Sequence, residues 1–259
     1  MDYKDILCTE KEGIFRIVLN RPESLNSLVI SMIDELINAL DYAAESKDIR
    51  VIVLAGAGKA FSAGGDLETI KSSNALSLRD YVEKIGGIIK LMSAIEKPII
   101  AEVSGVAVGS GCNLAIAADI VIAGEKARFG QGFLPLGFVN DGGGTYLMPR
   151  LIGLRKAKEI ILTGKMLNAE EAEKIGLITK VVKVEELESA VMEMAQQLAA
   201  SAPRALGFSK LLLNRSSAID LNEALAFEAY IQGICAQTND HKEGLDAFAN
   251  KRSPKFSGN

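Results

Sequence analysis

Three glycine-rich stretches carry most of the residues in this chain that could take part in chemistry. They are 61–67 (FSAGGDL), 104–113 (SGVAVGSGCN) and 137–145 (GFVNDGGGT), and we expect each of them to follow a strand. Glycine lets the backbone approach a ligand closely, and such a turn can leave amide N–H groups free to point at one spot. Two amides of this kind, with the positive end of a helix that begins near Ser110, would form an oxyanion hole suited to a thioester carbonyl that becomes an enolate.

Other familiar glycine and serine motifs are absent from these stretches and from the residues just before them. Gly58-Lys59 is followed by Ala60 rather than by Ser or Thr, so it does not form a phosphate-binding P-loop. No Gly-x-Gly-x-x-Gly opens the first βαβ unit, and Ser110 is not part of a Gly-x-Ser-x-Gly elbow. The chain has a single histidine, His241. We expect it to lie at the solvated start of a helix rather than to belong to a catalytic triad. The simplest alternative is that each stretch is a turn that needs a positive φ.

Alternating apolar and amphipathic segments in the first half of the chain predict an α/β fold. In that half we expect strands at 14–19, 51–54, 99–103 and 119–122 and helices at 28–45, 79–95 and 110–118. From Leu147 onward apolar residues recur at spacings of three and four residues, as on one face of a helix. This pattern predicts helices at 154–163, 169–175, 184–200, 203–214, 220–236 and 241–250. We therefore expect a core with the functional site over residues 1–200 and a helical C-terminal region over 201–259, within the same folding unit.

Composition and charge narrow the classes of function. The chain has 259 residues and a net charge of −4, without the basic excess that is typical of nucleic-acid binding. No apolar run approaches the ~18 residues of a membrane span, and the first residues form no apolar signal region. The three cysteines are far apart in the sequence and predict no zinc site. We expect a cytoplasmic protein with neither a membrane nor a nucleic acid as partner and without a metal or redox cofactor.

Several short motifs, in this order, resemble the crotonase or enoyl-CoA hydratase/isomerase superfamily over nearly the whole chain. They are LNRP at 19–22, LNSL at 25–28, AFSAGGDL at 60–67, GVAVGSGCNL at 105–114, ADIVIA at 118–123, ARFG at 127–130, GGT at 143–145, LTG at 162–164 and GL at 176–177. The resemblance implies a spiral of β-β-α turns and a helical C-terminal part that builds trimers, often paired into hexamers. It also implies an acyl-CoA thioester as substrate, so that coenzyme A arrives with the substrate and no separate cofactor is needed.

The same resemblance implies which residues form the site. The backbone amides of Gly65 and Ser110 would form the oxyanion hole, and the loop 60–66 would line the path of CoA. Lys251 and Phe248 resemble residues that approach CoA, in some members from a neighbouring subunit. The residues that we expect to bind the substrate or its CoA are Ala60, Ser62, Ala63, Gly64, Asp66, Leu67, Gly109, Asn113, Phe133, Phe138 and Lys251.

Two positions depart from the hydratase pattern. The hydratases that this sequence resembles use two glutamates to position and activate water, and Asn113 and Phe133 stand at the matching positions here. An amide has no accessible pKa and a phenyl ring has no proton to give, so we do not expect water addition by a pair of carboxylates. Asn113 is expected to bond to backbone inside the fold, and Asp66 is expected to cap or brace the oxyanion loop.

Asp141 is the remaining acid near these positions. Its apolar neighbours should raise the pKa of its carboxyl, because burial disfavours charge; they are Phe133, Leu134, Leu136, Phe138 and Val139. A carboxylate of this kind can shuttle a proton next to a thioester. Several isomerases of the superfamily use an aspartate at the matching position, and Phe133 with Asp141 resembles the isomerases of phenylacetyl-CoA ring breakdown. The alternative is that Asp141 is the N-cap of a following helix.

We therefore predict an acyl-CoA isomerase that shifts a double bond or rearranges a ring, with Asp141 as the proton shuttle for an enolate held in the oxyanion hole. Within the superfamily, one alternative is a hydratase or hydrolase with rearranged acid–base groups. A second alternative is a dehalogenase with Asp141 as the nucleophile. A third is an enzyme of the naphthoyl-CoA synthase type. An alternative of another class is a non-catalytic member that binds an acyl-CoA ester or associates with RNA.

Overall fold

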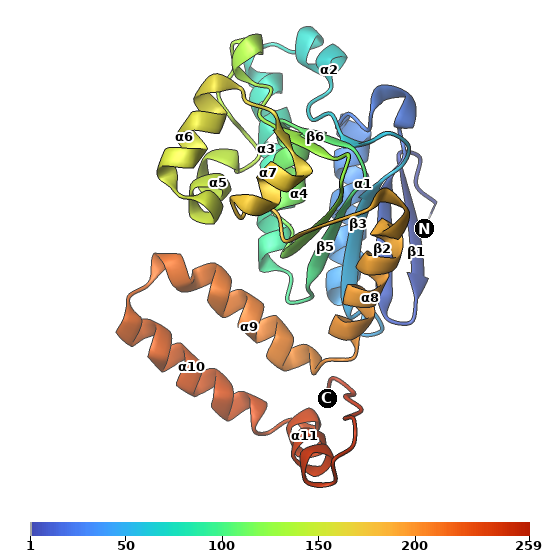
Figure 1. The fold of residues 1–259 in the computed structure, drawn as a ribbon, viewed down its shortest axis with the longest axis vertical. Helices are drawn as coiled ribbons and strands as arrows, with labels where there is room; N and C mark the ends of the chain where they lie inside the picture. Colours follow the sequence, from blue (N-terminus) through green and yellow to red (C-terminus); the bar gives the residue numbers. More distant parts are fainter. Residues whose placement is uncertain (1) are drawn as a thin grey trace.

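The computed structural model describes residues 2–259, which form two β-sheets surrounded by helices (Figure 1). The larger sheet has six strands, in the order β1 (Ile6–Lys11), β2 (Ile14–Leu19), β3 (Val51–Gly56), β5 (Ile99–Val103), β7 (Ile120–Gly124) and β10 (Lys180–Val182). The smaller sheet has four short strands, in the order β4 (Ala60–Ser62), β6 (Val106–Val108), β8 (Arg128–Gly130) and β9 (Leu167–Asn168). Only the pairs β1–β2 and β8–β9 are antiparallel.

The core repeats a β-β-α unit. In each repeat the first strand joins the larger sheet and the second strand joins the smaller one, as in the pairs β3 and β4, β5 and β6, and β7 and β8. The helices that follow are α2 (Leu67–Ser72) with α3 (Ala75–Ala94), then α4 (Ser110–Ile116), and then α5 (Gly144–Ile152). This arrangement confirms the predicted α/β class and its β-β-α turns.

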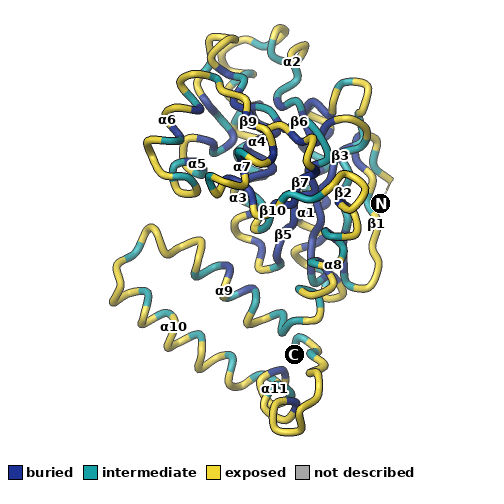
Figure 2. The backbone as a smooth tube through the Cα atoms, viewed as in Figure 1, coloured by how far each residue is buried: buried dark blue, intermediate teal, exposed yellow. Residues whose placement is uncertain are grey.

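The larger sheet buries both of its faces. Along β3, Ile52 and Leu54 belong to the main hydrophobic core with helix α1 (Ile30–Glu45) and α3, whereas Val51 and Val53 pack with helix α8 (Leu187–Ala199). This alternation follows from the period of two in a strand, and a run of apolar residues such as VIVLA is what a strand covered on both faces requires. Figure 2 shows the resulting dark band of buried residues between the helices.

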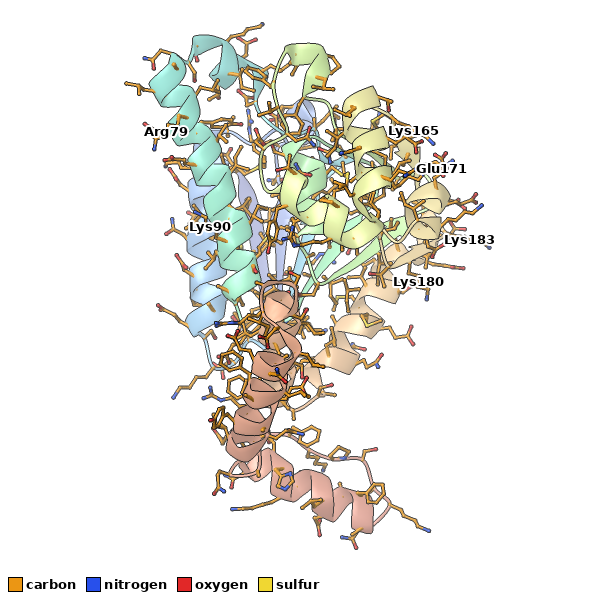
Figure 3. The ribbon with its side chains drawn as sticks, turned by 90° about the vertical axis from the view of Figure 1, so that its left-hand side faces the viewer. Arg79, Lys90, Lys165, Glu171, Lys180 and Lys183 are labelled. Atoms are coloured by element: carbon orange, nitrogen blue, oxygen red, sulfur yellow. The ribbon has the colours of Figure 1, made fainter. Side chains whose placement is uncertain are left out.

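The C-terminal helices extend from one end of this core (Figures 1 and 3). They are α9 (Pro203–Arg215), α10 (Leu221–Cys235) and α11 (Asn239–Ala249), and the predicted boundary at residue 200 falls between α8 and α9. Helix α10 buries none of its residues and leaves several apolar side chains exposed, among them Leu221, Leu225, Tyr230 and Ile234. Figure 3 also shows charged side chains such as Arg79 and Lys90 pointing outward from α3.

The predicted elements agree with the structure except in the short segments. The remaining elements are α6 (Leu154–Thr163), α7 (Ala169–Lys174) and the 3₁₀ turns Pro22–Ser24, Leu134–Leu136, Val184–Glu186 and Ser216–Ala218. The expectation that the stretch 137–145 follows a strand is wrong, because it follows the 3₁₀ turn Leu134–Leu136. Strand β1, the short strands β4, β6, β8, β9 and β10 and helix α2 were not predicted. Within residues 2–259, none of the helices has the length and apolar composition needed to cross a membrane.

Candidate active site

Three neighbouring parallel strands of the smaller sheet lead into the site. Strands β4, β6 and β8 pair in parallel, so their carboxyl ends lie at one edge of the sheet. The segments that leave this edge are 63–66 after β4, Gly109 and Ser110 after β6, and 131–133 after β8. The first two glycine-rich stretches, which are separate in the sequence, are therefore brought together by the register of these strands.

Gly64 is where two of these segments touch. Its φ is +89°, and a Cβ atom at this position would lie 2.6 Å from the carbonyl oxygen of Val108 and 3.2 Å from the amide nitrogen of Ser110. Such distances leave no room for a side chain. The absence of a side chain thus allows the loop 63–66 to lie directly against the first residue of helix α4.

Two of the backbone amides at this contact, those of Gly65 and Ser110, border the cavity described below and have no partner within residues 2–259. The amides of Ala63, Gly64 and Asp66 donate hydrogen bonds of 2.8, 3.1 and 3.0 Å within the chain. The amides of Gly65 and Ser110 donate none to any residue in 2–259. Ser110 is also the first residue of helix α4, where the helix dipole places positive charge. Both groups are suited to donate hydrogen bonds to a ligand oxygen that carries negative charge.

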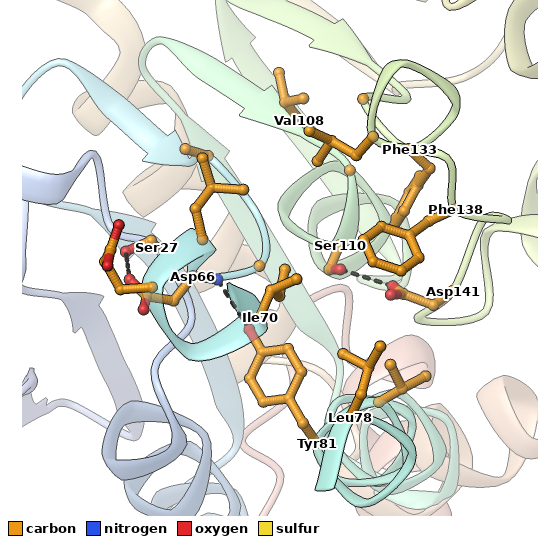
Figure 4. A pocket seen from close by; sticks show the side chains of 18 of the residues that line it. Ser27, Asp66, Ile70, Leu78, Tyr81, Val108, Ser110, Phe133, Phe138 and Asp141 are labelled. Atoms are coloured by element: carbon orange, nitrogen blue, oxygen red, sulfur yellow. Dashed lines mark hydrogen bonds between the residues drawn. The ribbon is translucent and has the colours of Figure 1, made fainter. Parts of the chain in front are cut away.

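A cavity of about 460 Å³ borders both amides, and Figure 4 shows the side chains that surround it. Gly65 and Ser110 lie on its wall, together with a mostly apolar set that includes Ile70, Leu78, Val82, Phe133, Phe138 and Val139. A largely apolar cavity with a few convergent polar groups is the usual form of a small-molecule site.

Asp141 brings a carboxylate to the same cavity. The hydroxyl of Ser110 donates a hydrogen bond of 2.7 Å to Asp141 Oδ1 (Figure 4). Burial raises the pKa of the Asp141 carboxyl, as predicted from its neighbours, and the hydrogen bond from Ser110 lowers that pKa in part. The alternative that Asp141 is a helix N-cap is wrong, because α5 begins after Gly143 and no side chain caps it.

A row of buried amide side chains holds the backbone of Asp141. Asn113 is fully buried, and its Nδ2 donates to the carbonyl oxygen of Asp141 over 2.8 Å. Asn113 Oδ1 accepts a bond of 3.0 Å from Gln131, whose Oε1 accepts one of 3.0 Å from Asn140. The hydrogen bond from Asn113 to backbone inside the fold is the one predicted from the sequence, and it leaves both ends of the Asn113 amide committed.

Comparison with known proteins places the chain in a family. A family model described as enoyl-CoA hydratase/isomerase matches residues 9–259. The chain belongs to the enoyl-CoA hydratase/isomerase family. It is 42% identical over 250 residues to a probable mitochondrial enoyl-CoA hydratase of Dictyostelium discoideum, covering 96% of this chain and 89% of that protein. It is 36% identical over 257 residues to 1,2-epoxyphenylacetyl-CoA isomerase of Escherichia coli, covering 98% of each.

The fold agrees with this membership. The crystal structure of an enoyl-CoA hydratase from Bacillus anthracis matches with a TM-score of 0.96 at 35% identity, covering 99% of this chain and 100% of that one. These findings confirm the resemblance to the crotonase superfamily that the motifs indicated. The chain is thus an enzyme of the enoyl-CoA hydratase/isomerase family, whose named relatives include both hydratases and isomerases.

The structure brings most of the predicted site residues of this family member to one cavity. The predicted residues on its wall are Ala63, Gly65, Asp66, Leu67, Gly109, Ser110, Phe133, Phe138 and Asp141. Ala60, Ser62, Gly64 and Asn113 are buried and are not among the wall residues, and Lys251 is exposed beyond helix α11. The binding roles of all these residues stay predictions.

Asp66 braces the loop, as expected. Its carboxylate caps α2 by accepting bonds of 2.9 Å from the amide and the hydroxyl of Thr69, and it accepts a further bond of 2.9 Å from Ser27. These bonds lower the pKa of Asp66 even though burial acts in the opposite direction. Tyr81 also lies on the cavity wall. It was not predicted, because in the sequence it is one more apolar position of a helix.

Proposed function

We propose that this member of the family is an acyl-CoA isomerase in which Asp141 moves the proton. The observation that carries the proposal is a single cavity bordered by the unpaired amides of Gly65 and Ser110 and by the half-buried carboxylate of Asp141. The other two acids on its wall are otherwise engaged: Asp66 accepts three hydrogen bonds, and Glu68 is exposed and paired with Lys71.

The reaction follows from these positions. The thioester oxygen accepts hydrogen bonds from the amides of Gly65 and Ser110, which stabilise negative charge on that oxygen. The Asp141 carboxylate takes a proton from carbon 2 of a 3-enoyl thioester, and the electron pair of that C–H bond moves into the enolate. The Asp141 carboxylic acid then returns the proton to carbon 4, which leaves the double bond between carbons 2 and 3. The same enolate could serve the rearrangement of a ring, since no atom is added or lost.

The side chains near Asp141 support proton transfer more than addition of water. Asn113 uses its amide to hold the backbone of Asp141, and Phe133 offers an apolar surface. A raised pKa suits a carboxylate that must take a proton and give it back. The second candidate function is that of a hydratase, because several relatives are named as hydratases. In that case Asp141 would position the water molecule.

We expect Asp141→Asn to lower kcat by about 10²–10⁴-fold, the range that a general acid–base group contributes. Because the asparagine side chain has nearly the same shape, the affinity for an acyl-CoA ester should stay within a few fold. The measurement is steady-state kinetics with a 3-enoyl-CoA, together with calorimetric binding of a saturated acyl-CoA. Asp80→Asn, a change of an exposed aspartate on α3, is the matched control. Normal turnover by Asp141→Asn would rule out the assignment.

A further inference from the structure

We propose that Tyr81 is a positioning residue, whose hydroxyl fixes the direction of the Gly65 amide. The inference rests on the proposed role of that amide in binding the thioester oxygen. Tyr81 comes from helix α3, is almost fully buried and reaches the loop 63–66 from the side of the cavity wall (Figure 4).

The Tyr81 hydroxyl makes two hydrogen bonds, one to the segment that contains Leu28 and one to the loop 63–66. It donates to the carbonyl oxygen of Leu28 over 2.6 Å and accepts from the amide of Asp66 over 3.0 Å. The amide of Leu28 in turn donates to the carbonyl oxygen of Gly64 over 2.8 Å. Leu28 and Gly65 form an isolated parallel bridge, and the Tyr81 hydroxyl joins its two sides.

These bonds hold both peptide planes that meet at Gly65. The plane between Gly64 and Gly65 is held through the Gly64 oxygen, and the plane between Gly65 and Asp66 is held through the Asp66 amide. A Cβ atom at Gly65 would lie 3.1 Å from Ile70 Cδ1 and 3.3 Å from the Tyr81 hydroxyl, so both side chains press against the face of Gly65 from which a side chain would project. Since glycine has the widest choice of backbone angles, an outside contact is needed to keep its N–H group pointing into the cavity.

The same geometry excludes Tyr81 as an acid or base. Its one proton is already donated to Leu28, and its oxygen already accepts from Asp66. Burial raises the pKa of Tyr81 to about 12, so the hydroxyl stays protonated at neutral pH. Its effect on the reaction therefore passes through Gly65.

The test removes only the hydroxyl, with Tyr81→Phe. Loss of a complete oxyanion-hole donor costs about 10²–10³-fold in kcat, and a loosened donor should cost less, so we expect kcat to fall about 5- to 30-fold. KM should stay within about threefold, because the walls that bind the acyl group are unchanged. Tyr42→Phe is the matched control, since the hydroxyl of this exposed tyrosine bonds to Glu10 on the surface and is not on the cavity wall.

A spectroscopic measurement separates positioning from a general loss of structure. An oxyanion hole polarises a bound thioester carbonyl, which shifts the ultraviolet absorbance of trans-cinnamoyl-CoA to longer wavelength. We expect this shift in the wild type, in Tyr42→Phe and in Asp141→Asn, and a smaller shift in Tyr81→Phe. An unchanged shift and unchanged kcat in Tyr81→Phe would overturn the role of Tyr81. Absence of the shift in the wild type would overturn the role of Gly65, whereas normal turnover by Asp141→Asn would overturn only the proton shuttle.

Hydrogen exchange keeps the inference testable if Tyr81→Phe does not fold. In the wild type, the amide proton of Asp66 should exchange far more slowly than an amide in an exposed turn, because the buried Tyr81 hydroxyl accepts it. Residue-resolved exchange by NMR measures this directly. Fast exchange of the Asp66 amide in the wild type would contradict the proposed positioning.

Discussion

Ser110 contributes two groups to the site. Its amide is one of the two without a partner, and its hydroxyl donates to the carboxylate of Asp141. The hydroxyl favours the charged form of that carboxylate, whereas burial favours the neutral form. A change of this side chain therefore separates the acid–base function from the oxyanion hole, because the amide is kept.

We expect Ser110→Ala to move the acidic limb of the pH profile to higher pH. Proton abstraction needs the charged form of Asp141, so kcat/KM falls as the pH drops through the pKa of this group. Removal of the hydroxyl takes away the hydrogen bond that lowers this pKa, which must then rise. Above the limb, kcat should stay within about threefold of wild type, since the amide remains. A limb that stays in place, or moves to lower pH, would contradict the assignment of Asp141 as base.

At the scale of single residues, the sequence predicted the apolar surroundings of a side chain better than its hydrogen-bond partners. The apolar neighbours of Asp141 in the chain were enough to predict the direction of its pKa shift, because most of them lie on the same cavity wall. Its hydrogen bond to Ser110 spans 31 positions and depends on the register of the smaller sheet, which a single sequence does not reveal. For the same reason Tyr81 could not be distinguished from a core residue.

At the scale of elements, the shortest strands do the positioning. The strand at 99–103 and the helix at 154–163 have the predicted bounds, since each has a clear apolar pattern. Strands β4, β6 and β8 are only three residues long, too short to show an alternation of apolar and polar residues. Yet these three strands place the segments of the site next to one another.

We expect Gly64→Ala to separate the two unpaired amides. A Cβ atom at Gly64 would meet the backbone of Val108 and Ser110, and the positive φ adds strain. Displacement of a donor should lower kcat by about 10²–10³-fold, and the free energy of unfolding should fall by about 1–3 kcal/mol. Kinetics and urea unfolding measure the two effects.

Gly86→Ala on α3 is the matched control for this change. A Cβ atom there would meet nothing within 4 Å, and alanine favours a helix interior over glycine by about 0.5–1 kcal/mol. This control should keep kcat and gain stability. Equal activity of the two variants would show that the close contact at Gly64 does not matter.

At the scale of the whole molecule, an ion pair between a buried lysine and a partly exposed aspartate connects the C-terminal helices to the core. Lys210 on α9 lies 2.8 Å from the carboxylate of Asp119 and donates to the carbonyl oxygens of Met92 and Lys97 over 2.9 and 3.1 Å. Burial lowers the pKa of Lys210 and raises that of Asp119. The exposed apolar face of α10 is consistent with the predicted trimer, which stays a prediction, as do contacts of Lys251 with CoA and a cytoplasmic location.

We expect Lys210→Met to lower the free energy of unfolding by about 1–3 kcal/mol, because the carbonyl oxygens of Met92 and Lys97 lose their donor and Asp119 loses its partner. Lys84→Met is the matched control, since Lys84 and Asp34 form a pair on the surface and such pairs contribute about 0–1 kcal/mol. Urea unfolding followed by circular dichroism measures both. Similar small losses in the two variants would show that the Lys210 pair does not hold α9 to the core.

The most direct test of the proposed function is a paired absorbance assay on the purified protein. One cuvette holds a 3-enoyl-CoA and the other a 2-enoyl-CoA, and the absorbance of the conjugated thioester is followed in both. If Asp141 shuttles a proton, the absorbance rises in the first cuvette and changes little in the second. A fall in the second cuvette with no rise in the first would show that water is added, and would contradict the isomerase proposal.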